Sequence, residues 1–389
     1  MAALIGAGLQ GFESCISETI MNSVFQPDWL SPPGDTIADV IEERGWDQKA
    51  LGRRLGYTSK HISQLINGKA PITDETAVRL ENVLGSSARF WMNREANYRA
   101  ALATIEETKQ HRQWISWTEK MPVKELMKIG AIPKRRLVES SKSAIVKDLL
   151  QFFSVASPGE WEQTYGQLQA SFRRTRKEQS NTGSITAWLR LGELRAQSLE
   201  APAYNESRFK KVLDEIRTLT IEESLDFEAE LRYHCASAGV LFVLVPAIPG
   251  AHVSGVARWL SKRRPMIQLS LYGKKNDRCW FSFFHEAGHI LFHRDHEDRI
   301  FLDDFQAAGQ QSEEEEEANK FASRILIPEK YEEEMRTLHS RGDVIAFAET
   351  IGIHPGIVVG RLQHEKIIRQ DWLNDLKGSF RFSEHHARQ

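Results

Sequence analysis

The sequence predicts a multi-domain, mainly α-helical protein with a small β-sheet in its C-terminal part. Its 389 residues exceed the roughly 100–200 residues of an ordinary domain, so two or three domains are expected. Hydrophobic residues make up 41% and charged residues 27%, which is the composition of a globular protein. Apolar residues recur at helical spacing through most of the chain, whereas strand-like apolar runs occur only between residues 239 and 271.

Breaks in this pattern divide the chain into five segments. The run Pro32-Pro33-Gly34 argues against a regular element, so residues 1–35 are expected to form a flexible lead-in. Helical spacing begins at Thr36, where Ile37, Val40 and Ile41 share one face. The other predicted segments are a helical domain over 36–100, a helical connector over 101–224, an α+β domain over 225–378 and a flexible tail over 379–389.

Charge, cysteine content and hydropathy exclude several classes of protein. Residues 101–200 carry 16 basic and 11 acidic side chains, whereas residues 201–389 carry 25 and 30, so the two parts suit different partners. No run of about 18 uncharged apolar residues is present, and the N-terminus lacks the basic segment of a secretory signal. The three cysteines are far apart in the sequence, which argues against a disulfide framework or a zinc site made of thiolates. A cytoplasmic protein without a membrane partner is expected.

The three strand-like runs lie in the predicted α+β domain. A helix over 221–238 is followed by a buried strand within 239–248. Residues 252–260 and 265–271 flank the basic turn Ser261–Arg264, which predicts a hairpin. Helices are expected from there to the end of the domain.

Residues 48–67 have the pattern of two short helices joined by a glycine turn. Leu51 and Leu55 share one face of the first helix, and Gly56 follows where the turn needs a positive φ. These features predict a helix-turn-helix, which presents the first turn of its second helix to the DNA major groove. An αα-hairpin used only for packing is the alternative. The side chains expected at DNA are Thr58, which also suits an N-cap, Ser59, Lys60, His61, Gln64 and Asn67, with Gln48 and Lys69 at phosphates.

The segment Thr36–Arg99 resembles the XRE/Cro-type helix-turn-helix family, in its HigA-antitoxin subtype. The resemblance rests on Gln48–Asn67, on Ile72–Leu80 and on the FWxNxxxxY ending of Phe90–Tyr98. It implies a five-helix domain that binds a palindromic double-stranded operator as a homodimer, with a cognate toxin as a further partner. Gly52 departs from the family, in which many members have alanine. The positions that match the family's base-reading residues are Ser59, Lys60 and Gln64, and Gln48 matches its phosphate contact.

Residues 281–293 place the sequence His-Glu-x-x-His in a strongly apolar stretch. His285 and His289 are four residues apart, so on a helix they project from one face and are able to share a metal ion. Glu286 stands where it could accept a proton from a metal-bound water. Burying two histidines and a glutamate in an otherwise apolar helix is costly unless they have partners, and a bound metal ion would be such a partner. A surface helix with a chance match is the alternative.

A second helix, starting at Glu313, is the expected source of a third zinc ligand. Glu314 and Glu315 lie at opposite edges of its buried stripe, so periodicity alone does not distinguish them as ligands. Asn319 lies one turn after Glu315 and could orient a ligating histidine, which favours Glu315 and leaves Glu314 as the alternative. The other glutamates of the run are expected to be solvated at a helix N-terminus.

The runs HEAGHILFH (285–293) and ExxANKFASRILIP resemble the ImmA/IrrE metallopeptidase family, over about residues 225–362. The resemblance implies a gluzincin-like enzyme in which His285, His289 and Glu315 bind Zn²⁺ and Glu286 is the general base. Two functions follow. The first is a DNA-binding regulator of the HigA type with a fused peptidase, and the second is a peptidase that cleaves a protein partner, a repressor or a toxin, with the helix-turn-helix as a targeting module. A scaffold with structural zinc is a third reading. His293 and His296 are expected to cap the helix or to be exposed.

Overall fold

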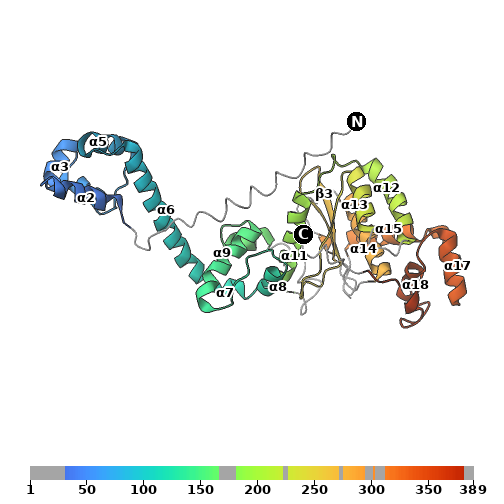
Figure 1. Cartoon of the computed structure of the whole chain (residues 1–389). Helices are drawn as coiled ribbons and strands as arrows, with labels where there is room; N and C mark the ends of the chain where they lie inside the picture. Colours follow the sequence, from blue (N-terminus) through green and yellow to red (C-terminus); the bar gives the residue numbers. More distant parts are fainter. Residues whose placement is uncertain are drawn as a thin grey trace, which may run out of the picture. The chain divides into compact units, whose positions relative to one another are not determined.

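The structure, a computed structural model, describes residues 31–165, 181–221, 227–270, 275–293, 301–302 and 312–380. This part of the chain is mainly helical and contains one small sheet (Figure 1), as the sequence predicts. The chain divides into two compact units, Met1–Gln110 and His111–Gln389. The predicted boundary at residue 100 differs from this division, and both boundaries fall inside the continuous helix α6 (Ala88–Gln113).

The first unit contains the five helices that the resemblance implies. They are α2 (Pro33–Glu43), α3 (Gln48–Leu55), α4 (Ser59–Ile66), α5 (Asp74–Leu84) and α6. Gly56 ends α3 with a φ of 74°, the left-handed conformation that the turn requires. The apolar faces of the helices form one core, which includes Ile37, Leu51, Leu55, Ile62, Leu65, Leu80 and Trp91.

Helix α2 begins at Pro33, ahead of the predicted start at Thr36. The prediction that this Pro-Pro-Gly run bars a regular element is therefore wrong for its last two residues. Proline suits the first helical position, because an N–H there would have no acceptor within the helix. Gly34 lies against the end of α4, where an added Cβ would stand 1.9 Å from the carbonyl oxygen of Ile66. Residues 1–30 of the predicted lead-in lie outside the described residues.

The second unit is built on a sheet with the strand order β1-β3-β2-β4. Its strands are β1 (Leu241–Leu244), β2 (Gly255–Trp259), β3 (Pro265–Leu269) and the two-residue β4 (Phe301–Leu302). Strands β2 and β3 form the predicted antiparallel hairpin, and β1 pairs with β3 in parallel. Strand β4 pairs with β2 at Val256 and Ala257, in a region where only helices were expected.

Helices cover both faces of this sheet (Figure 1). Leu241 and Val243 of β1 pack in one core with α9 (Lys142–Phe153) and α11 (Thr182–Gln197). Phe242 and Leu244 point the other way and pack with the remaining layer. That layer contains α12 (Glu206–Thr218), α13 (Phe227–Ser237), α14 (Asn276–Phe292), α15 (Glu313–Leu326), α17 (Arg341–Ile351) and α18 (Pro355–His364).

Shorter helical segments complete the second unit. They are α7 (Ile115–Thr118), α8 (Val123–Lys128), η1 (Glu139–Ser141), η2 (Leu219–Ile221), η3 (Glu329–Tyr331), α16 (Glu332–Arg336) and η4 (Asn374–Leu376). Among the described residues, no single helix has both the length and the hydrophobicity of a membrane span. The helices α17 and α18 pass that test only as a pair, bent by 114°, and only on length and composition.

The packing differs from the predicted division at residue 225. Segment 101–224 was expected to be a connector, yet its helices α9 and α11 share one core with a face of the sheet. The unbroken apolar sequence of β1 is the cause, since a strand that is apolar at every position needs partners on both faces. The prediction of a flexible tail over 379–389 is wrong for its first two residues, and residues 381–389 lie outside the described part of the chain. Ser379 pairs with Lys275, and Phe380 is buried against Phe227, with ring centroids 4.4 Å apart.

Candidate metal centre and nucleic-acid interface

Helix α14 carries the first candidate site residues through the core of the second unit. It packs against β2, β3, α15 and α18, so every residue from Ser282 to Ile290 is buried. His285 and His289 keep only 1% and 2% of their surfaces exposed. Their Nε2 atoms lie 3.0 Å apart. The structure thus brings the two histidines together, as their spacing predicts.

Helix α15 crosses α14 at close range. At Gly288, between the two motif histidines, an added Cβ would lie 3.2 Å from the Cα of Ala318 and 3.3 Å from the Cδ1 of Phe321. These distances are tighter than ordinary van der Waals contacts. The glycine therefore allows the backbones to approach closely enough for a short side chain to reach from one helix to the other.

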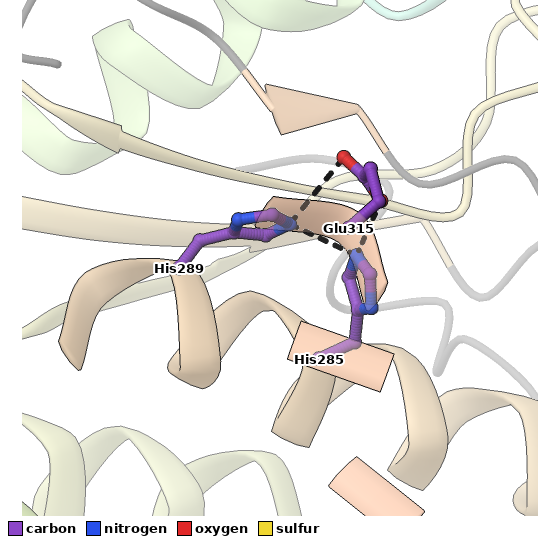
Figure 2. Close-up of side chains that lie close together, drawn as sticks. All are labelled: His285, His289 and Glu315. Atoms are coloured by element: carbon purple, nitrogen blue, oxygen red, sulfur yellow. Dashed lines mark hydrogen bonds and ion pairs between the residues drawn. The ribbon is translucent and has the colours of Figure 1, made fainter. Parts of the chain in front are cut away.

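Periodicity did not distinguish Glu314 from Glu315 as the third ligand, and the structure places Glu315 beside the histidines. Its Oε2 atom lies 3.2 Å from Nε2 of His285 and its Oε1 atom lies 3.5 Å from Nε2 of His289 (Figure 2). Potential ligand atoms of these three residues all lie within 4.8 Å of one another. Glu314 instead accepts a hydrogen bond from the Ser312 hydroxyl at 3.5 Å.

Hydrogen bonding and burial keep the imidazoles ready to bind a cation. His285 donates from Nδ1 to Oδ1 of Asn319 at 3.0 Å, the contact that the sequence predicts. Because an amide oxygen only accepts, Nδ1 carries the proton and Nε2 presents a lone pair. Burial, and to a lesser extent His285 and His293, lowers the pKa of His289 to about 2. His289 is therefore neutral, the form in which imidazole binds metals.

The donor set fits a tetrahedral metal ion. Ligand atoms bound at about 2.0–2.1 Å in a tetrahedron are roughly 3.3 Å apart. The separations of 3.0, 3.2 and 3.5 Å in the cluster lie around that value. A carboxylate and two imidazole lone pairs at such distances repel one another unless a cation lies among them. These residues could therefore hold a metal through three protein ligands.

Glu286 follows the first histidine and is fully buried. Its carboxylate lies against the start of β2, where an added Cβ on Gly255 would come 2.8 Å from Oε1. A side chain at residue 255 would occupy the space that the carboxylate needs. Sequence reasoning missed this glycine, because only the sheet arrangement brings β2 beside the motif.

His293, the last residue of the HEAGHILFH run, also belongs to this site. It is the C-cap of α14, as expected, but it is buried, with 7% of its surface exposed. Its Nδ1 lies 2.9 Å from Nδ1 of His289, and its Nε2 lies 3.1 Å from Oε2 of Glu317. The side chain of Glu317 is 57% exposed, as predicted, yet it contacts a buried residue. The spacing of four residues from His289 was the signal in the sequence; His296 lies outside the described residues.

In the first unit, the predicted DNA-contacting residues lie on and around α4, except Gln48, which begins α3. The exposed ones are Gln48, Thr58, Ser59, Lys60, Asn67 and Lys69, and the half-buried ones are His61 and Gln64. Ser59 and Lys60 thus face outward, as direct readout requires. Gly52 permits the turn between the helices, because an added Cβ would lie 2.8 Å from the carbonyl oxygen of Tyr57.

Three of these side chains have structural contacts as well. Thr58 caps α4 by accepting a hydrogen bond from the N–H of His61 at 3.2 Å. The ring of His61 packs on the edge of Tyr57, with centroids 4.6 Å apart. Asn67 donates from its amide to the carbonyl oxygen of Ser63 at 2.7 Å. These contacts hold α4 in place and leave Ser59 and Lys60 as its most available polar groups.

Comparisons with known proteins match one region in each unit. Residues 37–91 match a family model described as a helix-turn-helix, and residues 240–363 match one described as an IrrE N-terminal-like domain, a peptidase family. YddM, an uncharacterized HTH-type transcriptional regulator of Escherichia coli K12, is 33% identical over 76 residues, which are 20% of this chain and 79% of YddM. The chain belongs to the XRE-type helix-turn-helix regulators.

This regulator carries an IrrE-like peptidase domain in its second unit. The matched region contains the three clustered residues of α14 and α15. A crystal structure from Nostoc punctiforme, described as a candidate antidote protein of a plasmid maintenance system, is 28% identical to the chain. It aligns with 21% of this chain and 89% of its own, with a TM-score of 0.20, which is too low to support a conclusion about fold.

Proposed function

We propose that the second unit is a zinc-dependent endopeptidase in which His285, His289 and Glu315 hold the ion. The observation that carries this proposal is the mutual spacing of the three ligand atoms across α14 and α15. Three protein ligands leave one tetrahedral position for water, as in catalytic zinc sites, whereas structural sites are closed by four. Two histidines with one glutamate also suit zinc better than magnesium or calcium, which prefer oxygen ligands.

The residues around the cluster have distinct roles in this proposal. A zinc ion at such a site supplies Lewis-acid chemistry toward a peptide carbonyl and makes water acidic. Glu286 accepts the proton of the attacking water on its carboxylate and returns it to the leaving amine. Asn319 holds His285 in the tautomer that exposes Nε2. The apolar packing of α14 excludes bulk water from behind the site.

Metal analysis and cleavage assays separate the two parts of the proposal. We expect one zinc per chain in the purified protein and its loss in His289→Ala. A peptide library, read by mass spectrometry, should yield products with the zinc-loaded protein. Those products should disappear with Glu286→Gln while zinc is retained. A protein without zinc would contradict the metal site, and products that persist with Glu286→Gln would contradict the role of the base.

We propose that the first unit makes this chain a sequence-specific regulator of the HigA-like antitoxin type, and that regulation is its primary function. Ser59, Lys60 and Gln64 would read base edges, while Gln48 and Lys69 contact phosphates. The outward placement of Ser59 and Lys60 at the start of α4 supports this. Half-sites of a palindrome would be bound by two copies of the chain.

Selection of bound sequences from random duplex DNA tests the regulator. The double variant Lys60→Ala, Gln64→Ala should lose sequence preference, each lost base contact costing about 1–3 kcal/mol. Lys109→Ala removes one exposed charge from α6 and serves as the control. Retention of full preference by the double variant would contradict readout through α4. Co-purification of a small toxin encoded beside the gene would support the antitoxin assignment. Cleavage of a protein substrate by a chain that binds no DNA would instead favour the peptidase as the main output.

A further inference from the structure

We infer that His293 and Glu317 are positioning residues that fix the tautomer of His289 for metal binding. The inference rests on the proposed zinc site, to which it adds a second contact between α14 and α15. The two motif histidines each need the proton on Nδ1 so that Nε2 is available to a metal. Asn319 supplies the acceptor for His285, and His289 requires a comparable acceptor at its own Nδ1.

The acceptor for His289 is another imidazole. The Nδ1 atoms of His289 and His293 lie 2.9 Å apart, so one carries a proton and the other accepts it. For His289 to bind a metal through Nε2, its Nδ1 must be the donor, and His293 Nδ1 must accept. A neutral imidazole that accepts at Nδ1 has its proton on Nε2.

The carboxylate of Glu317 selects this arrangement. Its Oε2 atom lies 3.1 Å from Nε2 of His293, and an ionised carboxylate only accepts hydrogen bonds. Glu317 therefore favours the proton on Nε2 of His293, which leaves Nδ1 of His293 as an acceptor. The chain of contacts from Glu317 through His293 to His289 specifies one proton position at each step. Carboxylates that act on metal-binding histidines raise the basicity of the ligand as well as orienting it.

Geometry makes α15 the common support of both histidines. It presents Asn319 to His285 directly and Glu317 to His289 through His293, while Glu315 reaches both. His293 is buried and close to the helix end, so its ring has little freedom to turn away.

Zinc affinity, measured by competition with a chelator, tests the inference without peptidase activity. His293→Phe keeps the ring but removes both hydrogen bonds, and we expect its zinc dissociation constant to rise about 10–100-fold. Glu317→Ala should weaken binding in the same direction. His293→Gln and Glu317→Gln retain an acceptor at each step, so they should restore affinity to within about 3-fold of the unmodified chain. Glu316→Ala, on the neighbouring exposed residue, is the matched control.

Cobalt provides a second readout, since its visible absorption reports ligand geometry. The spectrum of the cobalt-loaded chain should change in His293→Phe and be restored in His293→Gln. Unchanged zinc affinity and an unchanged cobalt spectrum in both His293→Phe and Glu317→Ala would overturn the inference and leave the proposed zinc site standing. Glu317→Ala keeps the test decisive if His293→Phe does not fold, because the glutamate is largely exposed. Absence of zinc binding by the unmodified chain would instead refute the proposed site.

Discussion

Gly255 offers a direct test of how tightly the sheet holds the proposed general base. In Gly255→Ala, the new Cβ would lie 2.8 Å from Oε1 and 3.0 Å from Cγ of Glu286, and 2.9 Å from Cδ2 of Leu269. A relaxed carbon–oxygen contact is about 3.3 Å, so the carboxylate must move by roughly 0.5 Å. Because Glu286 is fully buried, that movement turns the carboxylate away from its position in the site.

The expected effect on catalysis is about tenfold. A displacement near 1 Å costs about 100-fold in rate, so half of that should lower kcat/KM by about 10-fold, or roughly 1.4 kcal/mol. Stability should change by less than about 2 kcal/mol, since alanine favours a strand over glycine by roughly 0.5–1 kcal/mol while overpacking costs about 1–3 kcal/mol.

The assay compares peptide cleavage and bound zinc in the same preparations. Gly342→Ala is the matched control, because its new Cβ would have Ser340 Oγ as its nearest neighbour, at 3.7 Å. We expect zinc to be retained in both variants and kcat/KM to fall only in Gly255→Ala. Full activity in Gly255→Ala would refute the reasoning that β2 sets the position of the Glu286 carboxylate.

Three further substitutions test the packing of the two units. Burial raises the pKa of Tyr165 to about 12, whereas unfolding restores a pKa near 10. The free energy of unfolding should therefore fall by about 1.4 kcal/mol per pH unit between these pH values, as measured by urea titrations. Tyr165→Phe should remove this part of the loss of stability at alkaline pH. Glu193→Gln leaves the half-buried Arg258 and Arg190 without their shared ion-pair partner and should lower the unfolding free energy by about 3 kcal/mol; an unchanged urea midpoint would contradict this. Gly34→Ala would place a Cβ 1.9 Å from the Ile66 carbonyl oxygen and should destabilise the first unit by about 3 kcal/mol, measured by its thermal unfolding.

Local signals predicted the helix-turn-helix and the clustering of the two motif histidines well. Leu51, Leu55 and Gly56 specify the helix, its buried face and its end through contacts that lie within a few residues. The pair His285 and His289 is likewise local, because helical spacing alone places both rings on one side. Such features depend on neighbouring residues in the sequence and can be predicted before any tertiary contact is known.

The remaining features depend on how elements meet. Glu314 and Glu315 could not be separated by periodicity, since the choice depends on where α15 crosses α14, which Gly288 controls. His293 was expected to be capping or exposed because its partner Glu317 is distant in sequence. The four apolar residues of β1 did indicate a buried strand, but they could not show which helices would cover the sheet.

The double cover of the sheet has a practical consequence for isolating the peptidase. A fragment that begins at residue 225, or one trimmed to the matched stretch 240–363, would lack α9 and α11. Solvent would then contact an apolar face of three adjacent strands, which consists of Leu241, Val243, Val256 and Met266. Apolar surface of that kind drives self-association, so shortened versions should precipitate, whereas polypeptides that begin near His111 should stay dispersed.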